Sequence, residues 1–177
     1  MKNQPTCLFL IGMPGSGKST IGRGLAKLLG RPFIDLDQQI EARCGVAIPV
    51  IFEIEGEQGF RKRETQVLSE VAQQPDVVVA TGGGAILAPE NQAILRDQGM
   101  VVYLKATVDE LLRRTSRDKN RPLLVTNDPR AKLEQLFQVR GPIYESLADM
   151  VVESGSTSVA SVVQKIAAKL KKTEGST

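Results

Sequence analysis

The segment that decides the fold of this chain reads GMPGSGKST and covers residues 12–20. Its first eight residues match the P-loop pattern GxxxxGK[ST] in full, between an apolar run and an amphipathic helical pattern. Glycines let the backbone turn N–H groups inward around phosphates, and the following helix adds the positive end of its dipole. Lys18 can reach the β- and γ-phosphates, and the Ser19 hydroxyl can ligate Mg²⁺. The segment therefore predicts a site for ATP and magnesium, although GTPases, ATPases and kinases all carry this motif.

Outward from this segment, short apolar runs alternate with longer stretches of helical spacing. The runs are residues 7–11, 33–36, 77–80, 100–104 and 150–152. They are apolar at successive positions, as strands buried on both faces of a parallel sheet are. The alternation of strand and helix predicts an α/β fold with a parallel sheet and right-handed crossovers.

Composition limits the chemistry that this chain can perform. Its 177 residues suit one domain, and 41% hydrophobic with 24% charged residues is typical of a globular protein. No histidine is present, which excludes Ser-His-Asp and Cys-His catalysis. The two cysteines, Cys7 and Cys44, form no metal-binding pattern and are expected to be free. A net charge of +3 suits anionic small ligands and does not require nucleic acid. No apolar run is long enough for a signal peptide or membrane span, so we expect a cytoplasmic protein.

Two stretches depart from the strand–helix rhythm. Residues from about 38 to 64 form an insertion after the second apolar run, which we interpret as an acceptor-binding subdomain. Residues 113–130 hold six basic residues against two acidic ones, together with Pro122 and Pro129. We interpret this second stretch as a mobile lid, with a solvated surface loop as the alternative.

Carboxylates and glycines follow the second and third apolar runs. Asp35 and Asp37 are two residues apart, which would place both on one side of a strand, facing magnesium and the acceptor hydroxyl. The alternative is that Asp37 caps the helical stretch that follows. Gly82–Gly84 would bring backbone close to a ligand at the same sheet edge, or would form a plain tight turn.

Arginines supply candidate contacts to anions. Arg140 falls on an apolar helical stripe, where a guanidinium needs an anionic partner, and Pro142 is expected to break that helix. Arg61 and Arg140 could hold a substrate carboxylate, or could form internal salt bridges with Glu57 or Glu64. Within the basic stretch, Arg121 could stabilise transition-state charge, and Arg113 and Arg114 could flank the nucleotide base.

Taken together, these segments resemble the shikimate kinase family. The matching pieces are GMPGSGKST, FIDLD, IFEIEGEQGFRKRE, TGGGA, RRT followed by RPLL, and RGPIY, in that order over residues 12–144. The resemblance implies a three-layer α/β/α fold of the nucleoside-monophosphate-kinase-like class, with a five-stranded parallel sheet. A single domain, 1–177, would carry a shikimate-binding subdomain near 33–64 and a lid near 113–130. The implied reaction transfers the γ-phosphoryl group of ATP to the 3-hydroxyl of shikimate, in aromatic amino-acid biosynthesis.

The resemblance also implies roles for individual residues. The nucleotide would be bound by Gly12, Pro14, Gly15, Ser16, Gly17, Lys18, Ser19, Thr20, Arg114 and Arg121, with Arg114 against adenine. Shikimate would be held by Asp37, Arg61, Gly82, Gly83, Gly84 and Arg140, with the arginines at its carboxylate. Ser19 and Asp35 would organise Mg²⁺. Catalysis would rest on Lys18, on Asp37 as candidate base, and on Arg121 closing with the lid.

Two departures from the family pattern stand out. The segment 153–157 lacks the Arg and Pro residues often found near adenine in this family, which puts the adenine contact there in doubt. Pro49 lies where the family usually begins a helix without proline, but proline suits the first helical position.

Other function classes remain as alternatives. A gluconate kinase or a nucleoside-monophosphate kinase would share the P-loop but not the segments FIDLD, EQGFR and RGPIY. A non-catalytic nucleotide-binding module is disfavoured by the intact Lys18, Ser19, Asp37 and Arg121. A nucleic-acid-binding ATPase is disfavoured because aromatic residues, which stack on bases, make up only 4% of the chain. We expect a monomer whose partners are ATP and shikimate, without nucleic acid or membrane.

Overall fold

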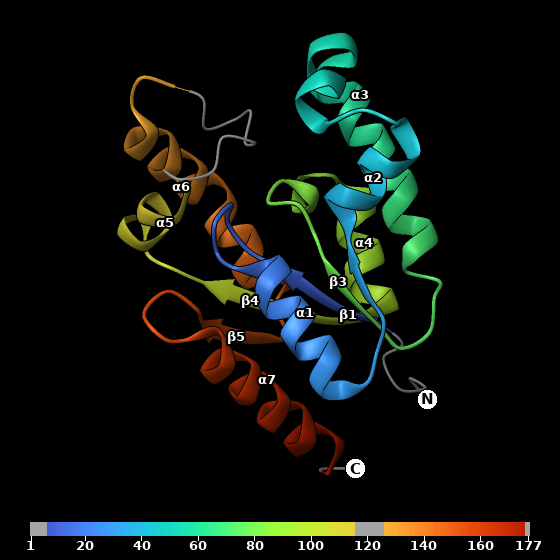
Figure 1. Ribbon diagram of the computed structural model, residues 1–177, viewed down its shortest axis with the longest axis vertical. Helices are drawn as coiled ribbons and strands as arrows, with labels where there is room; N and C mark the ends of the chain where they lie inside the picture. The colour runs from blue at the N-terminus through green and yellow to red at the C-terminus, as the bar shows by residue number, and fades with distance from the viewer. Residues whose placement is uncertain (1–6, 116–125, 176–177) are drawn as a thin grey trace.

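The computed structural model describes residues 7–115 and 126–175, in which a five-stranded parallel sheet carries helices on both faces (Figure 1). The strands are β1 (Cys7–Ile11), β2 (Phe33–Asp35), β3 (Val77–Ala80), β4 (Gly99–Lys105) and β5 (Met150–Glu153). The helices are α1 (Lys18–Leu29), α2 (Leu36–Cys44), α3 (Ile48–Val71), α4 (Pro89–Gln98), α5 (Val108–Thr115), α6 (Pro129–Leu147) and α7 (Val159–Glu174), with a 3₁₀ turn η1 (Ala85–Leu87).

Strand β1 lies at the centre of the sheet, whose order is β2-β3-β1-β4-β5. It pairs in parallel with β3 on one side and with β4 on the other. Because all strands run the same way, their carboxyl ends meet at one edge, and the chain reverses its direction of travel across the sheet next to β1. Open α/β sheets bind ligands in the crevice at such a point.

Alternate residues of β1 divide the core into two halves. Leu8 and Leu10 pack with Leu25 of α1 and Ile166 of α7 on one face. On the other face, Phe9 belongs to the larger cluster that includes residues of α3, α4 and α6. Figure 1 shows α1 and α7 together on the near side of the sheet. The α/β class and the five-stranded parallel sheet are therefore confirmed.

Several element boundaries differ from the sequence expectation. Leu36 begins α2 instead of ending β2, and β4 extends one residue further at each end than the predicted run. Pro49 lies in the first turn of α3, as expected. Helix α3 is interrupted at Gly56, whose φ of 71° and ψ of −178° are accessible almost only to glycine. The predicted insertion thus consists of α2 and the outer part of α3.

The predicted break at Pro142 is wrong. Helix α6 continues through this residue to Leu147, although proline cannot donate to the carbonyl four residues earlier. Buried side chains on both sides of the proline, Leu136 and Tyr144, hold the helix against the core. Tertiary packing here outweighs the loss of one backbone hydrogen bond.

Neither cysteine forms a disulfide; Cys7 is buried in β1 and Cys44 is half-buried at the end of α2. Within residues 7–115 and 126–175, no helix has both the length and the apolar character that a membrane span needs.

Candidate active site

The turn between β1 and α1 forms a phosphate cradle at the carboxyl edge of the sheet. Gly15 and Gly17 have φ values of 87° and 93°, which residues with a side chain rarely adopt. Gly17 is the N-cap of α1, so the first N–H groups of that helix face the turn. A helix N-terminus with inward N–H groups binds anions through both hydrogen bonds and its dipole.

Lys18 is held inside this cradle. Its Nζ donates to the carbonyl oxygens of Gly12 at 2.8 Å and Met13 at 2.9 Å, and the residue is only 8% exposed. These carbonyl groups hold the ammonium inside the turn, where its positive charge favours a phosphate.

Ser19 and Asp35 make a pair of oxygen donors next to the cradle. The Ser19 hydroxyl donates to Asp35 Oδ2 at 2.5 Å, and Asp35 Oδ1 accepts from the N–H of Gln38 at 3.1 Å. The carboxylate thus caps α2 with one oxygen and meets Ser19 with the other. A hydroxyl and a carboxylate are the hard oxygen donors that Mg²⁺ prefers, so the pair fits the predicted ion.

The two aspartates are not arranged as their spacing suggested. Asp35 ends β2 and is the capping residue, whereas Asp37 lies in the first turn of α2 and does not cap it. The strand argument is wrong because β2 ends at Asp35 and α2 already begins at Leu36. Both side chains nevertheless line one cavity of about 380 Å³, together with Lys18, Ser19, Thr20, Gly82, Gly83 and Arg114.

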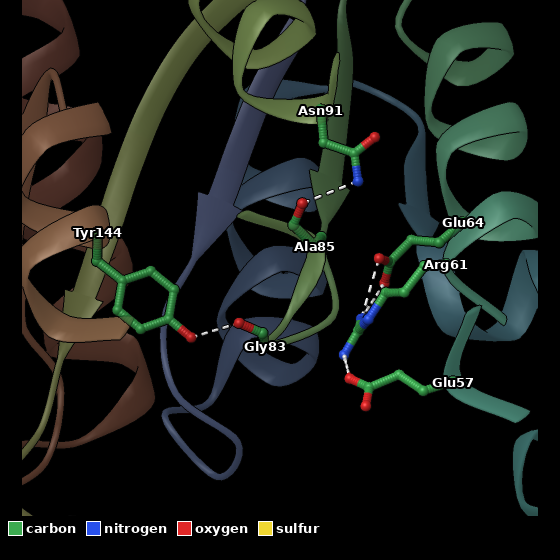
Figure 2. Close-up of polar contacts among 7 residues, drawn as sticks. All are labelled: Glu57, Arg61, Glu64, Gly83, Ala85, Asn91 and Tyr144. Carbon is green, nitrogen blue, oxygen red and sulfur yellow. Dashed lines mark hydrogen bonds and ion pairs between the residues drawn. The ribbon is translucent and has the colours of Figure 1, made fainter. Parts of the chain in front are cut away.

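Arg61 forms internal ion pairs, which the sequence offered as the alternative to a substrate contact. Its Nη1 donates to Glu64 Oε1 at 3.0 Å and its Nη2 to Glu57 Oε1 at 3.3 Å, as Figure 2 shows. The guanidinium also lies directly over Gly84, where any Cβ would overlap it. Arg61 therefore lies at the loop Gly82–Gly84, called the glycine loop below. Carboxylates of its own helix orient it there.

Arg140 reaches the same loop from α6. It is 3% exposed, and its Nη1 would lie 3.3 Å from a Cβ placed at Gly83. A Cβ placed at Gly82 would lie 2.9 Å from Asp37 Oδ1 and 3.2 Å from Glu64 Oε2. Two arginines and two carboxylates from α2, α3 and α6 thus surround the glycine loop.

Glu64 is a residue whose importance the sequence did not indicate. Its side chain is fully buried, and burial raises the pKa of its carboxyl to about 7. Arg61 and Arg140 oppose this rise in pKa, while the negative charge of Asp37 adds to it. The charge at the acceptor end of the site is therefore set by four coupled groups and not by the arginines alone.

Arg114 braces the nucleotide end of the site. Its Nη1 donates to the Gly15 carbonyl at 3.1 Å, and its Nη2 donates to the Ser154 carbonyl at 2.8 Å. Ser154, which sequence reasoning missed, is buried and donates its hydroxyl to the Ser16 carbonyl at 2.9 Å. Arg113, Arg114 and residues 155–157 line a second, wider cavity of about 700 Å³. The loop after β5 thus contacts the phosphate cradle through Ser154 and Arg114.

Part of the predicted lid is not described. Residues 116–125, which include Arg121, lie outside the described residues, and the ends of the predicted lid belong to α5 and α6. The described site residues are otherwise brought together at one edge of the sheet. Their chemical roles remain predictions.

Comparisons with known proteins agree on one family. The family model described as shikimate kinase matches residues 14–171. A shikimate kinase of Bordetella avium is 58% identical over 163 residues, which are 92% of this chain and 78% of that protein. The structure of a shikimate kinase from Acinetobacter baumannii in complex with shikimate superposes with a TM-score of 0.93. It is 45% identical and covers 95% of this chain and 94% of that one. A gluconokinase from Sinorhizobium meliloti has a TM-score of 0.58 at 19% identity, covers 97% of this chain and 94% of that one, and shares only the fold.

The raised pKa of Glu64 makes stability depend on pH in a defined direction. Folded protein retains a proton that the unfolded chain releases above its ordinary pKa of 4.5, so stability falls as pH rises from there to about 7. Each unit of such a pKa difference corresponds to about 1.4 kcal/mol. Glu64→Gln should flatten this decline, as measured by urea unfolding between about pH 5 and pH 7.5. Glu57→Gln, which alters an exposed carboxyl, is the matched control and should follow the wild type. An unchanged decline in Glu64→Gln would assign the pH dependence to other groups.

Proposed function

This chain belongs to the shikimate kinase family, and from that premise we propose that it transfers the γ-phosphoryl group of ATP to the 3-hydroxyl of shikimate. One observation carries the proposal: the phosphate cradle and an acceptor site with two arginines share one edge of the sheet. Lys18 lines the same cavity as Asp37 and Gly82. Arg61 and Arg140 approach the next residues of the glycine loop. A planar guanidinium fork suits the carboxylate of an anionic alcohol such as shikimate.

The nucleotide end supplies charge stabilisation. The N–H groups of residues 12–20 and the Lys18 ammonium would bind the β- and γ-phosphates, and Arg121 would add a second cation on lid closure. Mg²⁺ held by Ser19 and Asp35 would neutralise charge on the phosphate oxygens. Arg114 would flank adenine while it braces the turn below. Little base strength is needed if the transition state is loose, so positioning dominates.

The acceptor end supplies orientation. Asp37 would accept a hydrogen bond from the reacting hydroxyl and keep its oxygen in line with the γ-phosphate. Arg61, Arg140 and the N–H groups of Gly82–Gly84 would hold the other end of shikimate. The paired carboxylates Glu57 and Glu64 keep Arg61 in place before the substrate arrives.

We also propose how the chain is organised. One domain, 1–177, would contain the acceptor-binding subdomain near 33–64 and a lid near 113–130 that closes over both substrates. The protein would act as a monomer in the cytoplasm, and its two cysteines, which form no disulfide, are compatible with a reducing compartment.

The substrate itself is tested by a coupled assay of ADP release. Shikimate should be phosphorylated in the presence of ATP and Mg²⁺, whereas gluconate and nucleoside monophosphates should give only background rates. The reason is that the acceptor site offers two guanidinium groups for a carboxylate next to small backbone donors. Phosphorylation of gluconate or of a nucleotide in preference to shikimate would favour the alternative kinases.

The role of Asp37 is tested by Asp37→Asn. This change keeps the shape but weakens the acceptor for the hydroxyl proton, so kcat should fall by at least about 100-fold. Asp97→Asn, on the exposed last turn of α4, is the matched control and should leave kcat unchanged. A near-normal kcat for Asp37→Asn would remove this residue from the mechanism.

The role of Arg140 is tested by Arg140→Lys. The charge beside Glu64 remains but the fork is lost, so KM for shikimate should rise roughly 10- to 100-fold while KM for ATP stays constant. Arg43→Lys, which alters an exposed ion pair with Glu70, should change neither constant. If KM for ATP rose instead, Arg140 would serve the nucleotide.

A further inference from the structure

The glycine loop between β3 and η1 has an unusual distribution of hydrogen bonds. Each carbonyl from Gly82 through Ile86 accepts one. Two of the donors are backbone N–H groups inside the turn, Ala85 to the Gly82 oxygen and Leu87 to the Gly84 oxygen, both at 3.1 Å. The other three donors are side chains from neighbouring helices. This segment is rich in glycine, yet its carbonyl groups are fixed one after another.

The side chains that hold the loop come from two different helices. The Tyr144 hydroxyl of α6 donates to the Gly83 oxygen at 2.5 Å, and Asn91 Nδ2 of α4 donates to the Ala85 oxygen at 2.8 Å. Figure 2 shows both contacts, with Arg61 and its carboxylates on the side of the loop away from Tyr144. Gly84 therefore lies between two carbonyl groups that are each held by a buried side chain.

The N–H groups of the three glycines differ from these carbonyl groups. Within residues 7–115 and 126–175, those of Gly82, Gly83 and Gly84 donate no hydrogen bond. All described peptide bonds are trans, so each N–H points away from the preceding carbonyl. Because the Gly83 oxygen points toward Tyr144, the Gly84 N–H points away from α6, to the side where Arg61 lies.

We propose that Tyr144 and Asn91 are positioning residues: by holding the carbonyl groups on both sides of Gly84, they aim its N–H at the acceptor. This inference rests on the proposed function and assigns a task to two side chains outside the substrate contacts. Burial raises the pKa of Tyr144 above that of an ordinary tyrosine, so its hydroxyl remains a donor throughout the working pH range. Without it, the partly buried Gly83 oxygen would lose this donor, and the peptide would rotate to find another.

Tyr144 also links the loop to Arg140. The two residues are one turn apart on α6, and Arg140 approaches the loop at Gly83. One helix therefore sets both the guanidinium and the peptide plane that face the same substrate. The Tyr144 ring is stacked on Tyr103 of β4, with centroids 5.1 Å apart, which anchors this arrangement to the sheet.

The test is Tyr144→Phe, which removes one oxygen atom and keeps the ring. KM for shikimate should rise about 3- to 10-fold, in line with the loss of one hydrogen bond, while kcat and KM for ATP stay near wild type. Tyr103→Phe removes the hydroxyl of the stacked partner and is the matched control. It should leave all three constants unchanged. Melting temperatures of both variants separate loss of folding from loss of orientation.

A lower melting temperature for Tyr144→Phe with KM for shikimate unchanged would overturn the proposal, as would an equal rise in KM for ATP. Asn91→Ala removes the hydrogen bond to the Ala85 oxygen and should reproduce the selective rise in KM for shikimate. If neither variant folds, the wild-type protein still decides: saturating shikimate should move the Gly84 amide proton resonance downfield, and an unmoved resonance would overturn the proposal. If wild-type protein fails to phosphorylate shikimate at all, the proposed function fails first.

Discussion

The position of β1 at the centre of a parallel sheet is the constraint on which the site depends. A strand buried on both faces must be apolar at every position, and residues 7–11 are. Its carboxyl end therefore emerges between those of β3 and β4. The phosphate cradle, the capping aspartate Asp35 and the glycine loop all begin within a few residues of this one edge. Parallel pairing of the strands is therefore enough to bring these three features together.

Buried charge is the second theme of the structure. Lys18, Glu64 and Arg140 are all nearly inaccessible to solvent, which is expensive unless each has partners. The Lys18 ammonium donates to backbone carbonyl groups, and the Glu64 carboxyl interacts with arginines from two helices. Such an arrangement fixes the directions in which the charges point before any substrate binds. The site is therefore organised mainly by the protein and only completed by its ligands.

The fold was predictable from the sequence because its signals are local. Apolar runs placed the five strands within one or two residues, and the P-loop placed the nucleotide end. The acceptor end was harder to predict: because α2 begins at Leu36, Asp35 and not Asp37 caps the helix, and the two carboxylates do not lie on one strand. The helix break predicted at Pro142 was wrong because the sequence pattern does not show that residues on both sides of it pack against the core. Glu64 was expected only as a possible salt-bridge partner and Ser154 gave no signal, since the burial of both depends on which distant segments pack over them.

The hydrogen bond from Ser154 to Ser16 connects the loop after β5 to the turn between β1 and α1. The same loop lines the cavity of about 700 Å³ together with Arg113 and Arg114. In this chain the same loop also supports that turn, because the Ser154 hydroxyl donates to the Ser16 carbonyl. A sequence that replaces this loop must therefore keep that hydrogen bond if the geometry of the turn is to be retained.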